Sequence, residues 1–266
     1  MNERYCSSCT HDLGAPNVRE CGHSIERDSL KARFDNSISA ADGRGCQQVR
    51  SEFCEAVSEV SGVVIAMPAP RARDLTIDPR EIYANYEQLV GAGVRRPAPV
   101  NDDRARRLVA GAVFGSYAEH IRYGILALGN EALSNYGTVA CRLKGVAVQN
   151  RTTFLEMNSY AFVSVLKDGI PPGVRAVWDN RHMLALAKHG HQLQPGQNLN
   201  SWQGMLVKSH PGDRSKDDFI EAHVFGTVNV DSIETMVAVP GLEVRPEDQL
   251  DIDLAIEQFR RRGTSR

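Results

Sequence analysis

The sequence predicts an α+β fold, with helices in the first half of the chain and a mainly antiparallel sheet in the second. In the first half, apolar residues repeat at the spacing of a helix face, and Val49, Phe53 and Val57 are the clearest run. From residue 121 onward, short segments rich in β-forming residues alternate with Gly, Asn and Ser. The 266 residues are enough for one large domain with its own core.

Spacing and turn residues define the elements of the first half. The chain before residue 46 is polar and has few periodic apolar positions, so no regular element is predicted there. Asp78 and Pro79 mark a helix start, because Asp caps a helix and Pro fits its first turn. The predicted elements are a helix over 46–60, a strand over 63–67, a loop over 68–78 and helices over 79–90 and 102–119.

Glycine, proline and asparagine divide the second half into shorter elements. Pro171 and Gly173 interrupt the chain before a helical pattern, and Asp231 has the position of an acidic helix cap. The predicted elements are strands over 121–128, 136–143, 151–155 and 218–225, a helix over 174–188, a loop over 190–204, a helix from residue 231 and a helix over 246–259.

Composition and charge exclude several classes of partner. The net charge of -2 gives no basic field for nucleic acid or an anionic membrane. No apolar run approaches the roughly 18 residues that span a bilayer, and the first residues lack the apolar stretch of a secretory signal. Six cysteines at irregular spacing do not form the pattern of a disulfide framework. We therefore expect a protein of the cytoplasm, or one that leaves it without a cleaved signal.

The predicted strand over 218–225 carries a carboxylate beside an imidazole. Side chains alternate between the faces of a strand, so Glu221, His223 and Phe225 share one face and the apolar Ala222 and Val224 share the other. The apolar face must be the core face. The opposite face is either the solvated surface of an edge strand or a site in which Glu221 and His223 act together.

Two further segments supply polar groups that would suit a ligand. Thr153 lies in a predicted strand that is followed by Asn158 and Ser159, which are neutral hydrogen-bonding residues. Arg33 stands beside Asn36 and Ser37, and its planar fork would suit a pyrophosphate. Taken singly, each pattern is also typical of an ordinary strand with a turn, or of an exposed arginine.

Read in chain order, these segments resemble the Arg, Ser-Thr-Ser and Glu elements of bacterial mono-ADP-ribosyltransferase toxins and effectors. The segments are 33–37, 122–124, 152–154 with 158–159, and 219–223, in scattered blocks between residues 30 and 239. The resemblance implies an ADP-ribosyltransferase-like split β-sandwich with helices packed at one end. It places an irregular lead-in over 1–25, for secretion or zinc binding, before a catalytic domain over 26–266.

The resemblance also implies site residues and a substrate. NAD+ would be the substrate, with Glu221 as the catalytic carboxylate and His223 beside it. Glu221 would stabilise the positive charge that develops on the ribose as nicotinamide leaves. Arg33 would hold the pyrophosphate, and the ring of Tyr123 or Phe154 would stack on nicotinamide. The implied NAD-binding residues are Arg33, Asn36, Ser37, Tyr123, Gly124, Thr153, Phe154 and Ser159.

Two departures from the family pattern bear on the acceptor. Phe219 stands where the usual acceptor-orienting Glu or Gln is found, and the chain has no Ser-Thr-Ser triplet. The pattern therefore indicates an acceptor other than the common arginine. The resemblance implies a monomeric effector that acts on a host protein after secretion from the bacterial cytoplasm, with a threonine of ubiquitin as the candidate acceptor.

The N-terminal cysteines suggest a competing function. Cys6 and Cys9 form a C-x2-C pair, and Cys21 with His23 completes a set of four zinc-ligand types. This set resembles part of a RING finger, so the alternative is a zinc-binding adaptor or an effector of the ubiquitin-ligase type. The later cysteine pair that a RING finger needs is missing, and reduced, unpaired cysteines are therefore the favoured interpretation.

Overall fold

A computed structural model describes residues 14–91, 100–159, 162 and 170–264 of the chain. Helices and antiparallel strands are mixed in it, which confirms the α+β class. A seven-stranded antiparallel sheet lies at the centre, in the strand order β5-β4-β8-β2-β1-β3-β9. Its strands are β1 (Gly62–Met67), β2 (Ile121–Ala127), β3 (Val139–Leu143), β4 (Thr152–Leu155), β5 (Arg175–Val177), β8 (Glu221–Phe225) and β9 (Ile233–Ala238).

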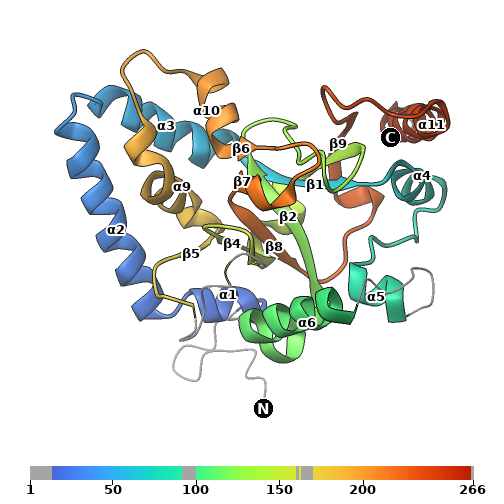
Figure 1. Cartoon of the computed structure of the whole chain (residues 1–266), viewed down its shortest axis with the longest axis horizontal. Coiled ribbons are helices and arrows are strands. Elements are labelled where there is room, and N and C mark those ends of the chain that lie inside the picture. Colours follow the sequence, from blue (N-terminus) through green and yellow to red (C-terminus); the bar gives the residue numbers. More distant parts are fainter. Residues whose placement is uncertain (1–13, 92–99, 160–161, 163–169, 265–266) are drawn as a thin grey trace.

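Helices surround this sheet on several sides, and a small hairpin of β6 (Val207–Lys208) and β7 (Asp218–Phe219) adjoins it. In Figure 1, α2, α3, α9 and α10 gather at one end of the sheet, whereas α4 and α11 lie at the other. The expectation of helices at one end is therefore wrong. The helices are α1 (Pro16–Cys21), α2 (Ser24–Asp42), α3 (Gln47–Val60), α4 (Ala69–Ile77), α5 (Tyr86–Gly91), α6 (Val100–Phe114), α7 (Gly145–Val148), α9 (Arg181–His189), α10 (Leu199–Leu206) and α11 (Pro246–Thr264).

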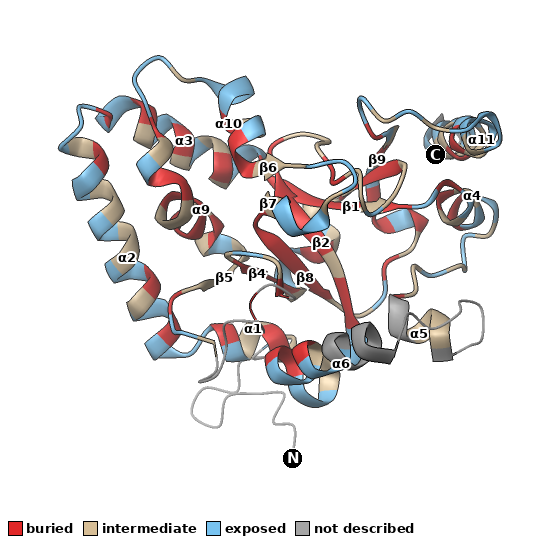
Figure 2. Cartoon of the chain, viewed as in Figure 1, coloured by how far each residue is buried: buried red, intermediate tan, exposed pale blue. Residues whose placement is uncertain are grey.

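The inner strands of the sheet are buried on both faces, as the mainly red β1, β2, β4 and β8 in Figure 2 show. The main core covers one face and includes Phe53, Phe154, Ala222 and Val224. The other face carries two smaller apolar clusters. One contains Val64, Ile125 and Phe219, and the second contains Val113, Phe114 and Ile121. Because strand residues alternate, Glu221 and His223 of β8 lie on this second face.

Several helices form where the sequence pattern gives a loop or no element. Residues 16–42 form α1 and α2, so the lead-in predicted over 1–25 is helical in its described part. The segment over 68–78 forms α4, because Pro70 lies in the first turn, where a proline costs no hydrogen bond. Part of the loop over 190–204 forms α10. The side chain of its N-cap residue Asn198 accepts hydrogen bonds from the backbone N–H groups of Asn200 and Ser201.

Three predicted helices are shorter than expected or are strands. The helix over 79–90 is reduced to α5, and the helix over 174–188 begins as strand β5 and becomes α9 only at Arg181. The helix from residue 231 is instead strand β9, which pairs with β3. The polar cap does exist there, because Asn229 accepts from Ser232 N–H, but it caps a 3-10 turn (Val230–Ser232) that leads into β9.

Gly137 allows the segment before β3 to pack directly on β1. A Cβ atom at this position would stand 2.2 Å from the carbonyl carbon of Met67. Backbone atoms of a central strand cannot move aside as the end of a flexible side chain can. The absence of a side chain at Gly137 is therefore a packing requirement.

We expect Gly137→Ala to lower the free energy of unfolding by about 1–3 kcal/mol, the usual cost of overpacking. Gly111→Ala is the matched control, because Gly111 lies in helix α6 with open space around its Cβ position. That change should raise stability by up to about 1 kcal/mol through helix propensity. Urea unfolding of both variants measures the difference, and equal stability of the two would contradict the packing requirement.

His189, the last residue of α9, is fully buried and held as a neutral imidazole. Its Nδ1 lies 3.3 Å from Nε2 of Gln192, and Oε1 of Gln192 accepts from Lys208. Burial is the main cause that lowers the pKa of His189 to about 3. The cations Lys188, Lys208 and His191 contribute to this lowering, and the negative charge of Asp218 opposes it. In the folded protein His189 therefore stays unprotonated at pH values where the same histidine of the unfolded chain binds a proton.

Stability should fall as the pH drops below about 6.5, the pKa of histidine in an unfolded chain. Over the window down to about pH 3, His189 should contribute about 1.4 kcal/mol of lost stability per pH unit. Urea unfolding at several pH values should show a shallower loss for His189→Leu than for the parent. The exposed His191→Leu is the control, and parallel curves for parent and His189→Leu would rule out the neutral buried imidazole.

Candidate active site at the start of strand β8

Glu221 is the first residue of β8, and its carboxylate is oriented by two hydrogen bonds. Its side chain is almost fully covered, with 7% of the residue exposed. Oε2 accepts from the backbone N–H of Ser159 at 2.8 Å and lies 3.0 Å from Nε2 of His223. Because a carboxylate only accepts, Nε2 of His223 carries the proton of this bond while Glu221 is ionised.

The ring of His223 is packed against aromatic rings of α6 and β2. Its ring centroid lies 4.7 Å from that of Phe114 at the end of α6, in an edge-on arrangement. The ring of Tyr123 in β2 contacts it at 5.6 Å, also edge-on. These contacts leave His223 1% exposed, so its ring reaches Glu221 but not solvent.

The neighbours of β8 carry other residues of the predicted site. β8 lies between β2 and β4, so Tyr123, His223 and Thr153 stand in one row across the sheet. The strand of Glu221 therefore adjoins the strand over 152–154.

Gly124 and Phe154 belong to the opposite face and require correction. Both pair with Ala222, which faces the main core. Phe154 is fully buried there beside Trp178, at a centroid distance of 5.9 Å. A ring in the main core cannot stack on a ligand at Glu221, so Phe154 is removed from the ligand-contacting set. A Cβ at Gly124 would lie 2.9 Å from the carbonyl oxygen of Val64, which explains the glycine by packing.

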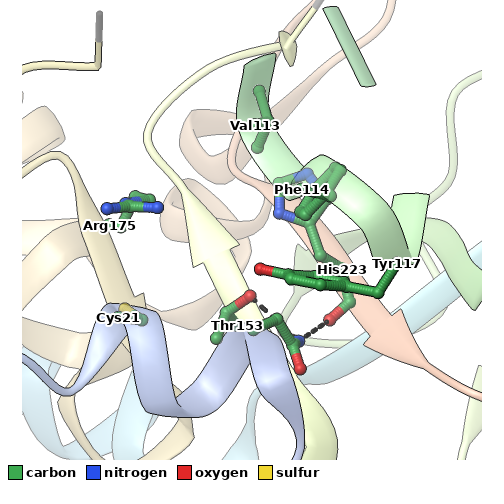
Figure 3. Close-up of a pocket in the computed structure, with 8 residues that line it drawn as sticks. Cys21, Val113, Phe114, Tyr117, Thr153, Arg175 and His223 are labelled. Carbon is green, nitrogen blue, oxygen red and sulfur yellow. Dashed lines mark hydrogen bonds between the residues drawn. The ribbon is translucent and has the colours of Figure 1, made fainter. Parts of the chain in front are cut away.

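Helix α1 covers the row on the side of Thr153. Figure 3 shows hydrogen bonds reaching the Thr153 hydroxyl and the His223 backbone from a side chain on this helix. That side chain is Asn17, whose Nδ2 donates to Thr153 Oγ1 at 3.2 Å, to the carbonyl of His223 at 3.0 Å and to the carbonyl of Arg151 at 3.2 Å. A small pocket remains here, lined by Asn17, Cys21, Val113, Phe114, Tyr117, Thr153, Arg175 and His223.

Arg33, Asn36 and Ser37 lie on helix α2 rather than in a loop. The guanidinium of Arg33 forms a 2.7 Å ion pair with Glu156 and donates to the carbonyl of Gly173 at 2.6 Å. Glu156 directly follows β4, so Arg33 is near the same edge of the sheet as Glu221. In the described residues, no hydrogen bond links Arg33, Asn36 or Ser37 to Glu221, and the charge of Arg33 is already balanced.

Tyr136 belongs to the site, although nothing in the sequence pattern singled it out. Its phenol accepts from Nδ2 of Asn158 at 3.3 Å. Burial raises the pKa of Tyr136, and the negative charges of Glu221 and Asp217 raise it further. Asn158 directly precedes Ser159, whose N–H donates to Glu221, so the phenol lies beside the segment that holds this carboxylate. The sequence placed Tyr136 at the start of a strand, whereas β3 begins three residues later. Only the fold brings this loop residue to β8.

The arrangement suits chemistry in which positive charge develops close to Glu221. The carboxylate is held in one orientation by Ser159 and His223. Asn158, the residue before Ser159, bonds to the uncharged phenol of Tyr136. A preoriented carboxylate in a partly dry site interacts strongly with nearby charge. It also has the geometry of a proton acceptor.

The proposed zinc ligands are only partly within the described chain. Cys6 and Cys9 lie outside the described residues. Cys21 is buried in α1, and burial raises the pKa of its thiol to about 12, which disfavours the thiolate that zinc binds. His23 is exposed before α2. Among the described residues, no three His, Cys, Asp or Glu side chains are grouped as a metal site.

Comparisons with known proteins assign no family to the chain, so the functional conclusion is drawn from the geometry of the site. No protein-family model matches the chain, and no curated protein sequence is similar enough to match it. In the described part of the chain, no helix has the length and apolar character to cross a membrane.

We expect Asn17→Ala to lower the free energy of unfolding by about 1–3 kcal/mol, because it leaves buried acceptors without their donor. The exposed Asn36→Ala on α2 is the control and should stay within about 0.5 kcal/mol of the parent. Urea or thermal unfolding of the two variants tests this. If Asn17→Ala is as stable as the control, α1 is not anchored through this amide.

Proposed function

We propose that the chain is an NAD-dependent mono-ADP-ribosyltransferase in which Glu221 is the catalytic carboxylate. The buried, hydrogen-bonded Glu221 beside His223 is the observation that carries this proposal. It is supported by the adjacency of β8 to the strands of Tyr123 and Thr153, and by the bond from Ser159. These residues belong to the segments that resemble the transferase family.

The chemistry follows from the position of a fixed negative charge. The bond between the ribose and nicotinamide breaks, and nicotinamide leaves with the bonding electron pair. Positive charge develops on the ribose, and Glu221 stabilises it more strongly than it stabilises intact NAD+. The acceptor then bonds to the same ribose carbon, and its proton passes to the Glu221 carboxylate.

In this proposal, the elements that cover the sheet near Glu221 determine the side from which NAD+ approaches. Thr153 and His223 are 3% and 1% exposed beneath α1 and Phe114, so they support the site from within. The ligand would reach Glu221 from the side of Tyr136 and Asn158. In this proposal His223 is a positioning residue that holds the carboxylate. Arg33 would contact a pyrophosphate only by releasing Glu156.

The position of Phe219 bears on which residue accepts the ADP-ribose group. Phe219, at the position where the family has its acceptor-orienting residue, is 3% exposed and packs in an apolar cluster. A buried phenylalanine cannot orient an arginine acceptor, which supports a different acceptor. We propose a host protein as the acceptor, with a threonine of ubiquitin as the candidate, and a bacterial effector as the biological role. The described strands form one seven-stranded sheet and one two-stranded hairpin rather than the expected split β-sandwich.

Glu221→Gln should slow nicotinamide release from NAD+ by about a hundredfold to a thousandfold, because it removes the charge that faces the developing cation. Glutamine still accepts from Ser159 N–H, so the unfolding midpoint should stay close to that of the parent. Transfer of labelled ADP-ribose to proteins of a cell lysate, followed by mass spectrometry, would identify the acceptor.

Glu55→Gln is the matched control, since Glu55 is exposed on helix α3. It should release nicotinamide at the parental rate. The proposal fails if the parent releases no nicotinamide, or if Glu221→Gln is as active as the Glu55→Gln control.

A further inference from the structure

Asn135 joins two loops beside the candidate site. Its Nδ2 donates to the carbonyl of His210 at 2.8 Å and to the carboxylate of Asp217 at 3.0 Å. Its Oδ1 accepts from Gly212 N–H at 2.8 Å, and its carbonyl accepts from Arg214 at 2.6 Å. Segments about 75 residues apart in sequence are thus held as one unit, the Asn135 platform, made of residues 134–136 and 209–217.

The platform presents an aromatic ring and a cation next to each other. The guanidinium carbon of Arg214 lies 5.0 Å from the centroid of the Tyr136 ring. Phe219 contacts that ring edge-on at 6.4 Å. Tyr136 is 38% exposed, and Arg214 is exposed. The ring is therefore supported by the protein and still open to a ligand.

Arg214 differs from Arg33 and Lys188, two other cations near the start of β8. Arg33 is paired with Glu156, and Lys188 is paired with Asp218 at 2.6 Å. Arg214 contacts a carbonyl and a ring, and in the described part of the chain it forms no ion pair with a carboxylate. Its positive charge is consequently available to an anionic ligand, whereas the charges of Arg33 and Lys188 are already balanced.

We propose that Arg214 and Tyr136 bind the diphosphate end of the nucleotide whose ribose lies at Glu221. This inference rests on the proposed function and assigns the phosphate contact of that site to Arg214. The phenol of Tyr136 accepts from Asn158, the residue before Ser159, whose N–H donates to Glu221. The guanidinium of Arg214 lies over the ring of the same tyrosine. A ribose followed by a diphosphate presents its groups in the same order. The planar guanidinium donates to phosphate oxygens through charge-assisted bonds.

The test compares two ligands that share the nicotinamide and its ribose. NAD+ also carries the diphosphate and the adenosine beyond it, whereas nicotinamide riboside ends at the ribose. Arg214→Gln should weaken NAD+ binding by about tenfold to a hundredfold, the loss of a hydrogen bond to a charged group. It should leave the binding of nicotinamide riboside unchanged. Tyr136→Ala should weaken both ligands, because the ring supports the ribose end as well.

Arg80→Gln is the matched control, since Arg80 is an exposed arginine of a turn far along the chain from this platform. Dissociation constants come from calorimetric titration of full-length protein, with unfolding midpoints measured for each variant. If the parent binds NAD+ and Arg214→Gln binds it as well as Arg80→Gln does, the inference is overturned while the proposed function stands. If the parent binds no NAD+, both fall.

A third result would point to a different ligand. Arg214→Gln would then keep parental NAD+ affinity and parental nicotinamide release, yet transfer less ADP-ribose to the acceptor. This outcome would overturn the phosphate assignment and make the Asn135 platform a contact surface for the acceptor protein.

Discussion

A carboxylate on a strand that is covered on both faces must be balanced by hydrogen bonds, and Glu221 of β8 is in this position. Burial of an unpaired charge costs far more than a domain can offset. The N–H of Ser159 and the ring of His223 supply the balance. Much of the site follows from this requirement. The segment after β4 must place Ser159 next to Glu221, and the rings of Phe114 and Tyr123 must keep His223 in position.

Those neighbours make the site one-sided. Phe114 packs on His223, and Asn17 ties α1 to β4 at Thr153 and to β8 at His223. The buried row between them supports the carboxylate from within the protein. Next to Ser159, Asn158 bonds to the phenol of Tyr136, and both of these side chains are uncharged. A positive charge that develops at Glu221 meets a carboxylate that is already held in one orientation.

The charged side chains around the sheet divide into two kinds. Glu26 with Arg175 joins α2 to β5, Arg33 with Glu156 joins α2 to the end of β4, and Lys188 with Asp218 joins α9 to β7. In each pair the attraction is used to hold elements together. Arg214 is held by a carbonyl and a ring instead, so the loop is ordered while the cation remains open to a ligand.

The sequence by itself determined the α+β class, the strands β1, β2 and β8, and the shared face of Glu221 and His223, because a two-residue period and apolar content are local properties. It did not determine α2, which has few buried apolar positions, or β9, which begins after a capped turn. Only the tertiary structure shows that Arg33 pairs with Glu156, that Phe154 faces the core and that Tyr136 bonds to Asn158. These contacts join residues far apart in the chain, and their partners depend on strand order and on which face each strand covers. No local pattern carries that information.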